Sequence, residues 1–211
     1  MYWSSAAAPQ YTTFNGYGVL RTTPTISAAN AISTQTYKNL PTGSDPYSVV
    51  AVFKPNSVEG HRFLVTAGLP ESSPYSTLIN PIAINPASKY VGGCWGSLGT
   101  WLSHLGSTPT TDHYVMMVTT FNGSTEKVYI NNVFEKAARM TPGTVPSIRN
   151  TVVIGMSSAT HHTMNADVGL VLMYNRSLSS SEVTQMYSTY ANRFVLPTSG
   201  ISTVISTELV L

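Results

Sequence analysis

The sequence predicts an all-β domain in which sheets pack against one another, with one short helix near the C-terminus. Three observations support this fold class. Short runs of β-branched and aromatic residues recur along most of the chain, and Asn-Gly or Asn-Asn pairs separate several of them. Only one segment, close to the end, has helical periodicity. The strands before that segment need a partner sheet to cover their apolar faces.

The composition suits one globular domain and argues against several functional classes. The chain has 211 residues, of which 42% are hydrophobic, so it is long enough to bury a core without disulfides. Charged residues make up 9%, against about 25% in ordinary domains. The net charge is +2 and no two Lys or Arg residues are adjacent, so no nucleic-acid-binding patch is indicated. No apolar run approaches the roughly 20 residues that span a bilayer, and we expect no membrane insertion.

The first half of the chain contains three clear strand patterns. Residues Tyr11–Thr22 alternate around a glycine-rich centre, which predicts two short strands or one bent strand. Tyr47–Phe53 is apolar on both faces, which is typical of a strand in the middle of a layered structure. Arg62–Gly68 is the next predicted strand. We therefore expect Tyr47–Phe53 to be central.

Two further segments follow before the middle of the chain. The stretch Leu78–Pro86 contains two Asn-Pro pairs. Because proline cannot donate a hydrogen bond to a β-ladder, we expect an edge or a loop there rather than a central strand. Tyr90–Trp101 mixes glycine with two tryptophans and is expected to hold two short strands around a turn.

A meander is predicted in the second half. His113–Phe121 is a strand pattern, Asn122-Gly123 is a strong turn signal, and Glu126–Asn131 is the returning strand. Asn131-Asn132 predicts a second tight turn, because asparagine tolerates positive φ. Val133–Arg139 then continues the meander.

The last part of the chain supplies two strands and the helix. Thr151–Met156 and Ala166–Tyr174 are strand patterns. Ser179 and Glu182 have the spacing of a capping box, which predicts that a helix begins at Ser179. Apolar residues then recur with helical spacing, so one face of this helix is expected to pack on a sheet; they are Val183, Met186, Tyr187 and Tyr190.

Four segments give the chain a resemblance to laminin-G-like domains of the concanavalin A-like lectin/glucanase group. They are FNGYGVLRT near the start, PYSVVAVFKPNS, the hairpin HYVMMVTTFNGSTEKVYINNVFEKA, and GLVLMYNRSLSSSEVTQMY before the helix ends. The resemblance spans roughly Tyr11–Phe194. The chain departs from the family pattern at Asn132, where the family usually has glycine, and between Pro70 and Pro109.

This resemblance implies a two-sheet antiparallel jelly-roll sandwich with a short terminal helix. It also divides the chain into an N-terminal arm (1–10), a jelly-roll domain (11–196) and a β-prone C-terminal arm (197–211). Proteins of this fold bind glycans, bind proteins, hydrolyse polysaccharides or serve as structural modules, so the fold alone does not select a function.

Enzymatic activity is not expected. Glycoside hydrolysis needs two carboxylates across the scissile bond, and the hydrolases of this group carry them on one strand as Glu-x-Asp-x-(x)-Glu. Of the nine acidic residues here, no two lie within four residues of each other. Glu126 and Glu135 fall on neighbouring strands of the meander, where turns and solvated edges explain them adequately.

No cofactor or metal site is predicted either. The three aspartates, Asp45, Asp112 and Asp167, lie far apart in the sequence and lack the acid-rich loop that calcium prefers. His161-His162 has no Cys or acidic residue nearby at ligand spacing, so both are interpreted as surface-loop residues. Cys94 with His104 or His113 would form a catalytic pair only through the tertiary fold, with no orienting group indicated.

Trp95 and Trp101 are the candidate glycan contacts. They lie in a glycine-rich region where exposure is plausible, and sugars stack on exposed aromatic faces. The alternative explanation, which we favour at this point, is that both fill the core of the sandwich, as most tryptophans do.

The sequence leads to two functional hypotheses. The first is a non-enzymatic structural protein of a larger assembly, such as a viral capsid or surface component, whose terminal arms dock on other protein subunits. The β-prone tail Ile201–Leu211 supports it, since such a tail can add a strand to a neighbour's sheet. This hypothesis implies a place in a virion or at an extracellular surface, without a recognisable signal peptide. The alternative is a lectin-like module that binds glycans.

Overall fold

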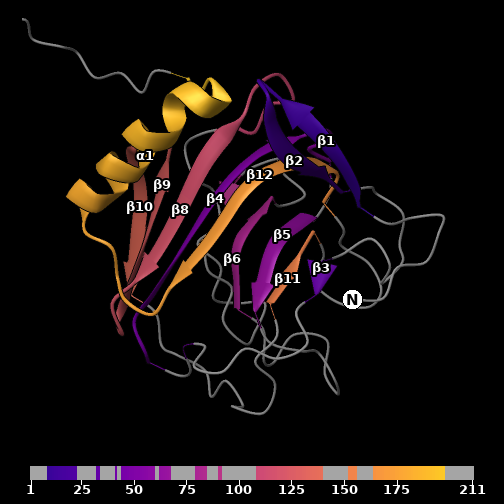
Figure 1. Ribbon diagram of the computed structural model, residues 1–211. Coiled ribbons are helices and arrows are strands. Elements are labelled where there is room, and N and C mark those ends of the chain that lie inside the picture. Colours follow the sequence, from indigo (N-terminus) through magenta and orange to yellow (C-terminus); the bar gives the residue numbers. More distant parts are fainter. Residues whose placement is uncertain are drawn as a thin grey trace, which may run out of the picture.

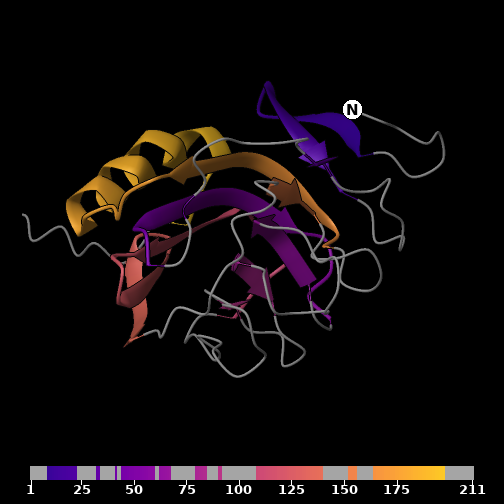
Figure 2. The same ribbon diagram turned by 90° about the horizontal axis from the view of Figure 1, so that it is seen from below.

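The computed structural model describes residues 9–22, 32–33, 41, 44–59, 62–67, 79–84, 90–91, 108–139, 152–155 and 164–197. In this part of the chain, two antiparallel sheets stack face to face, and one helix covers the outer face of the larger sheet (Figures 1 and 2). The predicted fold class, an all-β two-sheet sandwich with one C-terminal helix, is confirmed.

The larger sheet has seven strands with β4 at its centre. Their order is β1 (Gln10–Phe14), β2 (Tyr17–Arg21), β12 (Ala166–Tyr174), β4 (Tyr47–Pro55), β8 (Val115–Phe121), β9 (Thr125–Ile130) and β10 (Val133–Arg139). Every residue from Tyr47 to Phe53 is buried, so the prediction that this strand lies in the middle of a layered structure is confirmed.

The smaller sheet has five strands in the order β3 (Ile32–Ser33), β11 (Val152–Ile154), β5 (Arg62–Ala67), β6 (Ile79–Ile84) and β7 (Tyr90–Val91). Strand β6 pairs with β5 on one side and β7 on the other, so the expectation of an edge or a loop was wrong. Ala67 pairs with Ile79 and Val65 with Ile82, which leaves Asn80-Pro81 at a register shift. Proline is tolerated there because a bulge interrupts the ladder that its missing N–H would otherwise break.

Asparagine and glycine supply the positive φ angles of the tight turns. Asn15 and Gly16 (φ 50° and 77°) join β1 to β2, so this segment forms two strands rather than one bent strand. Asn131 and Asn132 (φ 47° and 66°) join β9 to β10, as the Asn-Asn pair predicted. Asn132 therefore takes a conformation for which glycine is the commoner choice.

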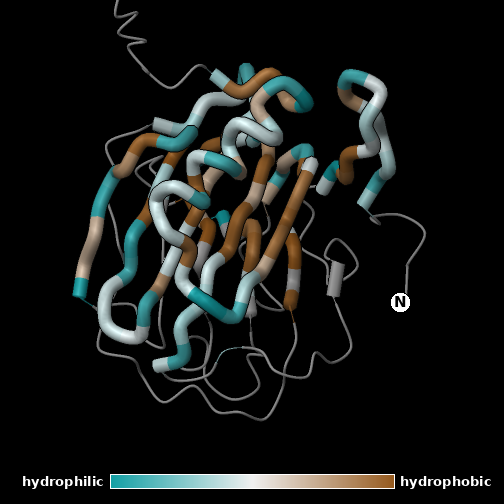
Figure 3. The backbone as a smooth tube through the Cα atoms, turned by 60° about the vertical axis from the view of Figure 1, so that its left-hand side comes forward, coloured by the Kyte–Doolittle hydropathy of each residue, from teal (hydrophilic) through white to brown (hydrophobic). Residues whose placement is uncertain are grey.

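Hydrophobic residues, brown in Figure 3, are concentrated along the strands of the sandwich. Their side chains form two apolar layers, one on each face of the larger sheet. Alternate residues of β4, including Val49, Ala51 and Phe53, point between the sheets and pack on Leu64 and Ile82 of the smaller sheet. The intervening residues Val50 and Val52 pack with the buried face of the helix, where Val183, Tyr187 and Phe194 lie. Because both faces of β4 are buried, polar and apolar residues do not alternate along this strand.

The helix α1 (Ser180–Phe194) begins as the sequence predicts. The backbone N–H of Ser179 donates to Glu182 Oε2 (2.8 Å), and the Glu182 N–H donates to Ser179 Oγ (3.3 Å), which completes the capping box. Arg176 also pairs with Glu182 (2.7 Å). The hydrogen bond from Arg176, with those of Ser179, lowers the pKa of Glu182 to about 2.

The helix ends on a strained residue, Val195. Its φ and ψ of 51° and 50° are left-handed, and a β-branched residue disfavours this region. Val195 is 60% exposed, so burial of its side chain offsets little of this strain. We expect Val195→Gly to raise the free energy of unfolding by about 0.5–1 kcal/mol, because glycine adopts this conformation without steric cost. Urea unfolding would measure the gain; Val195→Ala, which keeps a Cβ, should give less, and a loss of stability for Val195→Gly would contradict the strain argument.

Candidate functional site

The β1–β2 hairpin, drawn in indigo in Figure 1, stands at one end of the seven-stranded sheet. Within the described residues, β1 pairs only with β2, and β2 pairs with β12 through two residue pairs, Arg21–Asp167 and Leu20–Val168. Because so few backbone pairs join β2 to β12, side-chain contacts must hold much of the hairpin on the sheet. The hairpin is therefore an exposed element whose position depends on a few anchors.

Tyr11 of this hairpin presents an aromatic ring to solvent, with 77% of the residue exposed. Because Tyr11 pairs with Leu20 and Thr13 with Gly18, Tyr11 and Gly18 are diagonal neighbours on one face of the hairpin. A Cβ atom placed on Gly18 would meet the hydroxyl oxygen of Tyr11 first and would lie 2.7 Å from Cε2 of Tyr11 and 2.9 Å from its Cζ. The hydroxyl end and one edge of the Tyr11 ring thus lie beside Gly18, in space that only a glycine leaves free. We call Tyr11 beside Gly18 the edge platform.

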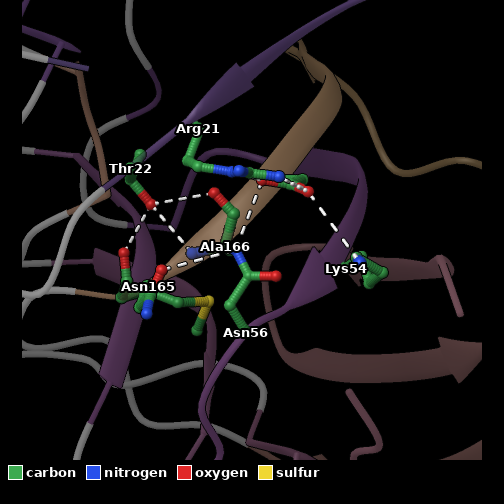
Figure 4. A network of polar contacts seen from close by, with 8 residues as sticks. Arg21, Thr22, Lys54, Asn56, Asn165 and Ala166 are labelled. Atoms are coloured by element: carbon green, nitrogen blue, oxygen red, sulfur yellow. Dashed lines mark hydrogen bonds and ion pairs between the residues drawn. The ribbon is translucent and has the colours of Figure 1, made fainter. Parts of the chain in front are cut away.

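A polar network centred on Asp167 anchors the hairpin (Figure 4). Asp167 is only 4% exposed. Its two oxygens accept hydrogen bonds from Arg21 Nε (2.7 Å) and Nη2 (2.9 Å), and Oδ1 also accepts one from Asn56 Nδ2 (3.3 Å). Lys54 Nζ lies 4.0 Å from Oδ2. The buried carboxylate is thus paired with partners from β2, β4 and the residue after β4.

The net electrostatic effect on Asp167 favours the ionised form. Burial by itself raises the pKa of its carboxyl group, but the hydrogen bonds from Arg21 and Asn56 and the charges of Arg21 and Lys54 outweigh burial, so the pKa is lowered. Asp167 is consequently a charged anchor at neutral pH rather than a proton donor.

Backbone contacts reinforce the same junction. The Thr22 N–H donates to the carbonyl of Ala166 (2.9 Å), and the Ala166 N–H donates to Thr22 Oγ1 (3.1 Å). Thr22 Oγ1 also donates to the carbonyl of Met164. The Asn56 N–H donates to the carbonyl of Asn165 (2.8 Å). Residues more than 100 positions apart are therefore locked together at the start of β12.

Aromatic contacts join the hairpin to the helix on the outer face of the sheet. The Phe14 and Tyr114 ring centroids are 4.6 Å apart, and those of Tyr114 and Phe194 are 5.3 Å apart. The guanidinium of Arg193 lies 4.4 Å from the centre of the Tyr17 ring, a cation–π contact. The outer face of the hairpin is thus held by contacts with Tyr114 and the helix, and the inner face carries the edge platform.

The residues that the sequence singled out have mixed outcomes. Six of them lie outside the described residues, so the predictions made for them remain predictions; they are Cys94, Trp95, Trp101, His104, His161 and His162. Asp45, Asp112 and His113 are exposed. Within the ranges that the structure describes, no three His, Cys, Asp or Glu side chains gather as metal ligands would.

Glu126 requires a correction. Its interpretation as a turn or solvated-edge residue was wrong, because it is fully buried (0% exposed) within β9, where it pairs with Ala138 of β10. Glu135 lies on the edge strand β10, at the register shift between Phe134 and Lys136. The two carboxylates are therefore not cross-strand partners.

The edge platform and the Asp167 network were both missed from the sequence. The platform had a signal: a two-residue turn at Asn15-Gly16 fixes Phe14 opposite Tyr17, and counting back places Tyr11 diagonal to Gly18. The network had none, because Arg21 and Asp167 are 146 positions apart.

Among the helices that the structure describes, none combines the length and apolar character needed to cross a bilayer.

Comparisons with known proteins agree on one group. A family model described as the concanavalin A-like lectin/glucanases superfamily, of laminin-G type, matches residues 27–184. A search of the curated proteins finds no match.

Three solved structures illustrate the similarity. The binding domain of Paraclostridial Mosquitocidal Protein 1 is 12% identical (TM-score 0.65), and the match covers 88% of this chain and 46% of that one. Domain 4 of AbnA, a GH43 extracellular arabinanase from Geobacillus stearothermophilus, in complex with arabinotriose, is 14% identical (TM-score 0.65), with coverages of 86% and 82%. The Ruminococcus gnavus IT-sialidase CBM40 bound to α2,3-sialyllactose is 11% identical (TM-score 0.58), with coverages of 74% and 98%.

At these identities the likeness concerns the fold, and the chain spans less than half of the mosquitocidal-protein binding domain. Two of the three structures hold a bound saccharide and the third is described as a binding domain. None of the three is described as a capsid or virion component, so that hypothesis finds no support in them. The predicted arms and localisation remain untested.

Proposed function

Since this chain belongs to the concanavalin A-like lectin/glucanases superfamily, we propose that it is a lectin-like, non-catalytic domain that binds glycans. The fold by itself leaves binding, hydrolysis and structural roles open. The proposal therefore depends on the edge platform, supported by the two similar domains whose structures contain arabinotriose and sialyllactose.

The observation that carries the proposal is the position of the Tyr11 ring. Pyranose and furanose rings have faces of C–H groups that pack on an aromatic face, while their hydroxyls need polar partners at the rim. Tyr11 offers a largely exposed aromatic ring with a phenolic hydroxyl at its end, and that end lies beside Gly18.

Binding without hydrolysis fits the charges around the platform. The hairpin from Gln10 to Arg21 contains no acidic residue, whereas glycoside hydrolysis needs two carboxylates about the scissile bond. Asp167, the aspartate that anchors the hairpin, is engaged by Arg21 and Asn56. Its lowered pKa also makes it unsuitable as a general acid.

Tyr11→Ala tests the platform. We expect the wild-type chain to bind at least one member of a glycan array that includes arabinotriose and α2,3-sialyllactose. Titration calorimetry on that ligand should show about threefold to tenfold weaker binding by Tyr11→Ala, the loss of one aromatic stacking contact. Gly18→Ala should also weaken binding, because its methyl group would displace the hydroxyl end of the Tyr11 ring.

Phe134→Ala is the matched control. Phe134 is also an exposed aromatic residue (54%), but it lies on β10, the opposite edge strand of the same sheet, so its removal should leave binding unchanged. A blank array would contradict the proposed function. Binding that Trp95→Ala or Trp101→Ala abolishes, and Tyr11→Ala does not change, would keep the function but move its site away from the platform.

A further inference from the structure

The sequence contains two Asn-Gly pairs, and both lie in described hairpin turns. In such a pair the backbone nitrogen of glycine can attack the side-chain amide of asparagine, because glycine has no Cβ to hinder the approach. The reaction needs rotation of the asparagine side chain toward that nitrogen. The two turns of this protein restrain that rotation very differently.

Asn122 is tightly held. Its Oδ1 accepts hydrogen bonds from the Ser124 N–H (3.1 Å), the Ser124 hydroxyl (3.2 Å) and the Thr125 N–H (2.8 Å). Its own N–H donates to the carbonyl of Thr125 (3.2 Å). Gly123 is crowded as well, since a Cβ placed there would lie 2.9 Å from the carbonyl oxygen of Ser44. Attack at Asn122 would require these contacts to break first.

Asn15 has none of these restraints. Both Asn15 and Gly16 are exposed, and in the described part of the structure the Asn15 side chain makes no hydrogen bond. Apart from its two chain neighbours, no residue that the structure describes has an atom within 4 Å of the position that a Cβ on Gly16 would take. The turn also closes an edge hairpin with a five-residue ladder, the type of element that opens locally at low cost.

We propose that Asn15–Gly16 is a site of spontaneous deamidation, and that its isoaspartate product breaks the register of the β1–β2 hairpin. The Gly16 nitrogen forms a bond to Cγ of Asn15 and loses its proton, while the Cγ–NH₂ bond breaks and ammonia leaves. Water then opens the five-membered imide at either carbonyl, giving aspartate or isoaspartate. Water is the only co-reactant.

The two products differ in their structural effect. Aspartate keeps the backbone length and, like asparagine, tolerates positive φ. Isoaspartate carries the main chain through the former side chain and adds one backbone atom to a two-residue turn. The pairing of Phe14 with Tyr17 then cannot persist as it is, and every pair beyond it in the ladder is affected, including the Thr13–Gly18 pair beside the edge platform.

The test is incubation of the folded full-length chain at mildly alkaline pH, followed by peptide mapping by mass spectrometry. We expect Asn15 to convert at least about tenfold faster than Asn122, because three hydrogen bonds to one amide oxygen must break at Asn122. In denaturant the two rates should converge, since only the fold distinguishes the turns. Asn15→Gln should remove the fast conversion without changing the rate at Asn122.

Two results would overturn the proposal. Equal rates at both turns in the folded chain, or faster conversion at Asn122, would show that the local restraints do not control the reaction. An isoaspartate fraction as stable to urea as the Asn15→Asp variant would disprove the register effect. Neither readout depends on glycan binding, so this proposal and the proposed function fail separately.

Discussion

Replacement of Phe194 by alanine is expected to lower the free energy of unfolding by about 3–5 kcal/mol, the cost of removing a fully enclosed phenylalanine. Phe194 is the last residue of α1 and is 0% exposed. Its ring contacts Tyr114, with ring centroids 5.3 Å apart, and lies against Gly169 of β12. Urea unfolding would measure the loss. Thr189→Ala, at an exposed helical position, is the control and should stay within about 0.5 kcal/mol of wild type.

A substitution at Gly169 tests the same contact between the helix and the sheet. A Cβ atom on Gly169 would lie 2.5 Å from Cζ of Phe194 and 3.0 Å from its Cδ1, so Gly169→Ala should destabilise the protein by about 1–3 kcal/mol through overpacking. In the double variant the methyl group meets the space that the ring vacates. The two losses should therefore be clearly less than additive in a double-mutant cycle. Strict additivity would contradict the direct contact that docks the helix on the sheet.

Local signals in the sequence were sufficient for most strands and for the start of the helix. The Asn15-Gly16 and Asn131-Asn132 pairs fix turns because positive φ is a property of those residues themselves. The capping box at Ser179 likewise involves atoms only three residues apart. Features of this kind need no knowledge of the partner strand.

The wrong predictions concerned residues whose environment is set by a neighbouring strand. The sequence shows that Pro81 cannot donate a hydrogen bond, but only the pairing of β6 with β5 shows that the ladder shifts register at that point. Glu126 was misassigned although its own strand held a clue. It alternates with Val128 and Ile130, both buried in the layer between the sheets, and a period of two places Glu126 on that same face.

The candidate site was harder to foresee than the fold. Tyr11 becomes notable only when the turn register puts it beside Gly18, and Arg21 has its main partner near the opposite end of the chain. Aromatic composition drew attention to Trp95 and Trp101 instead, since large rings suggest stacking wherever they occur. Those two predictions await a test of their own.

The fall in the free energy of unfolding at acidic pH is expected to depend on Asp167. Its folded-state pKa is lowered, so its carboxylate stabilises the fold above the unfolded pKa of about 3.9, and this contribution disappears as the pH falls through the folded value. At neutral pH, Asp167→Asn should cost about 1–3 kcal/mol, the usual worth of charge-assisted hydrogen bonds to a buried group. The lower part of that range is expected, because the Arg21 side chain is 45% exposed and water screens the pair.

The decisive comparison is the pH dependence of urea unfolding between about pH 3 and pH 7. Glu182, whose pKa is lowered to about 2, also contributes to the acid loss of the wild-type protein, so the variant should keep part of the slope. The difference between wild type and Asp167→Asn should be constant near neutrality. It should shrink below about pH 4, where the unfolded wild-type chain takes up a proton at Asp167, and it should stop shrinking only below the lowered folded-state pKa. Asp112→Asn, at an exposed aspartate outside the network, should follow the wild type throughout. A difference that stayed constant down to pH 3 would mean that packing, rather than charge, anchors the hairpin, since a neutral Asp167 would then hold Arg21 as well as an ionised one does.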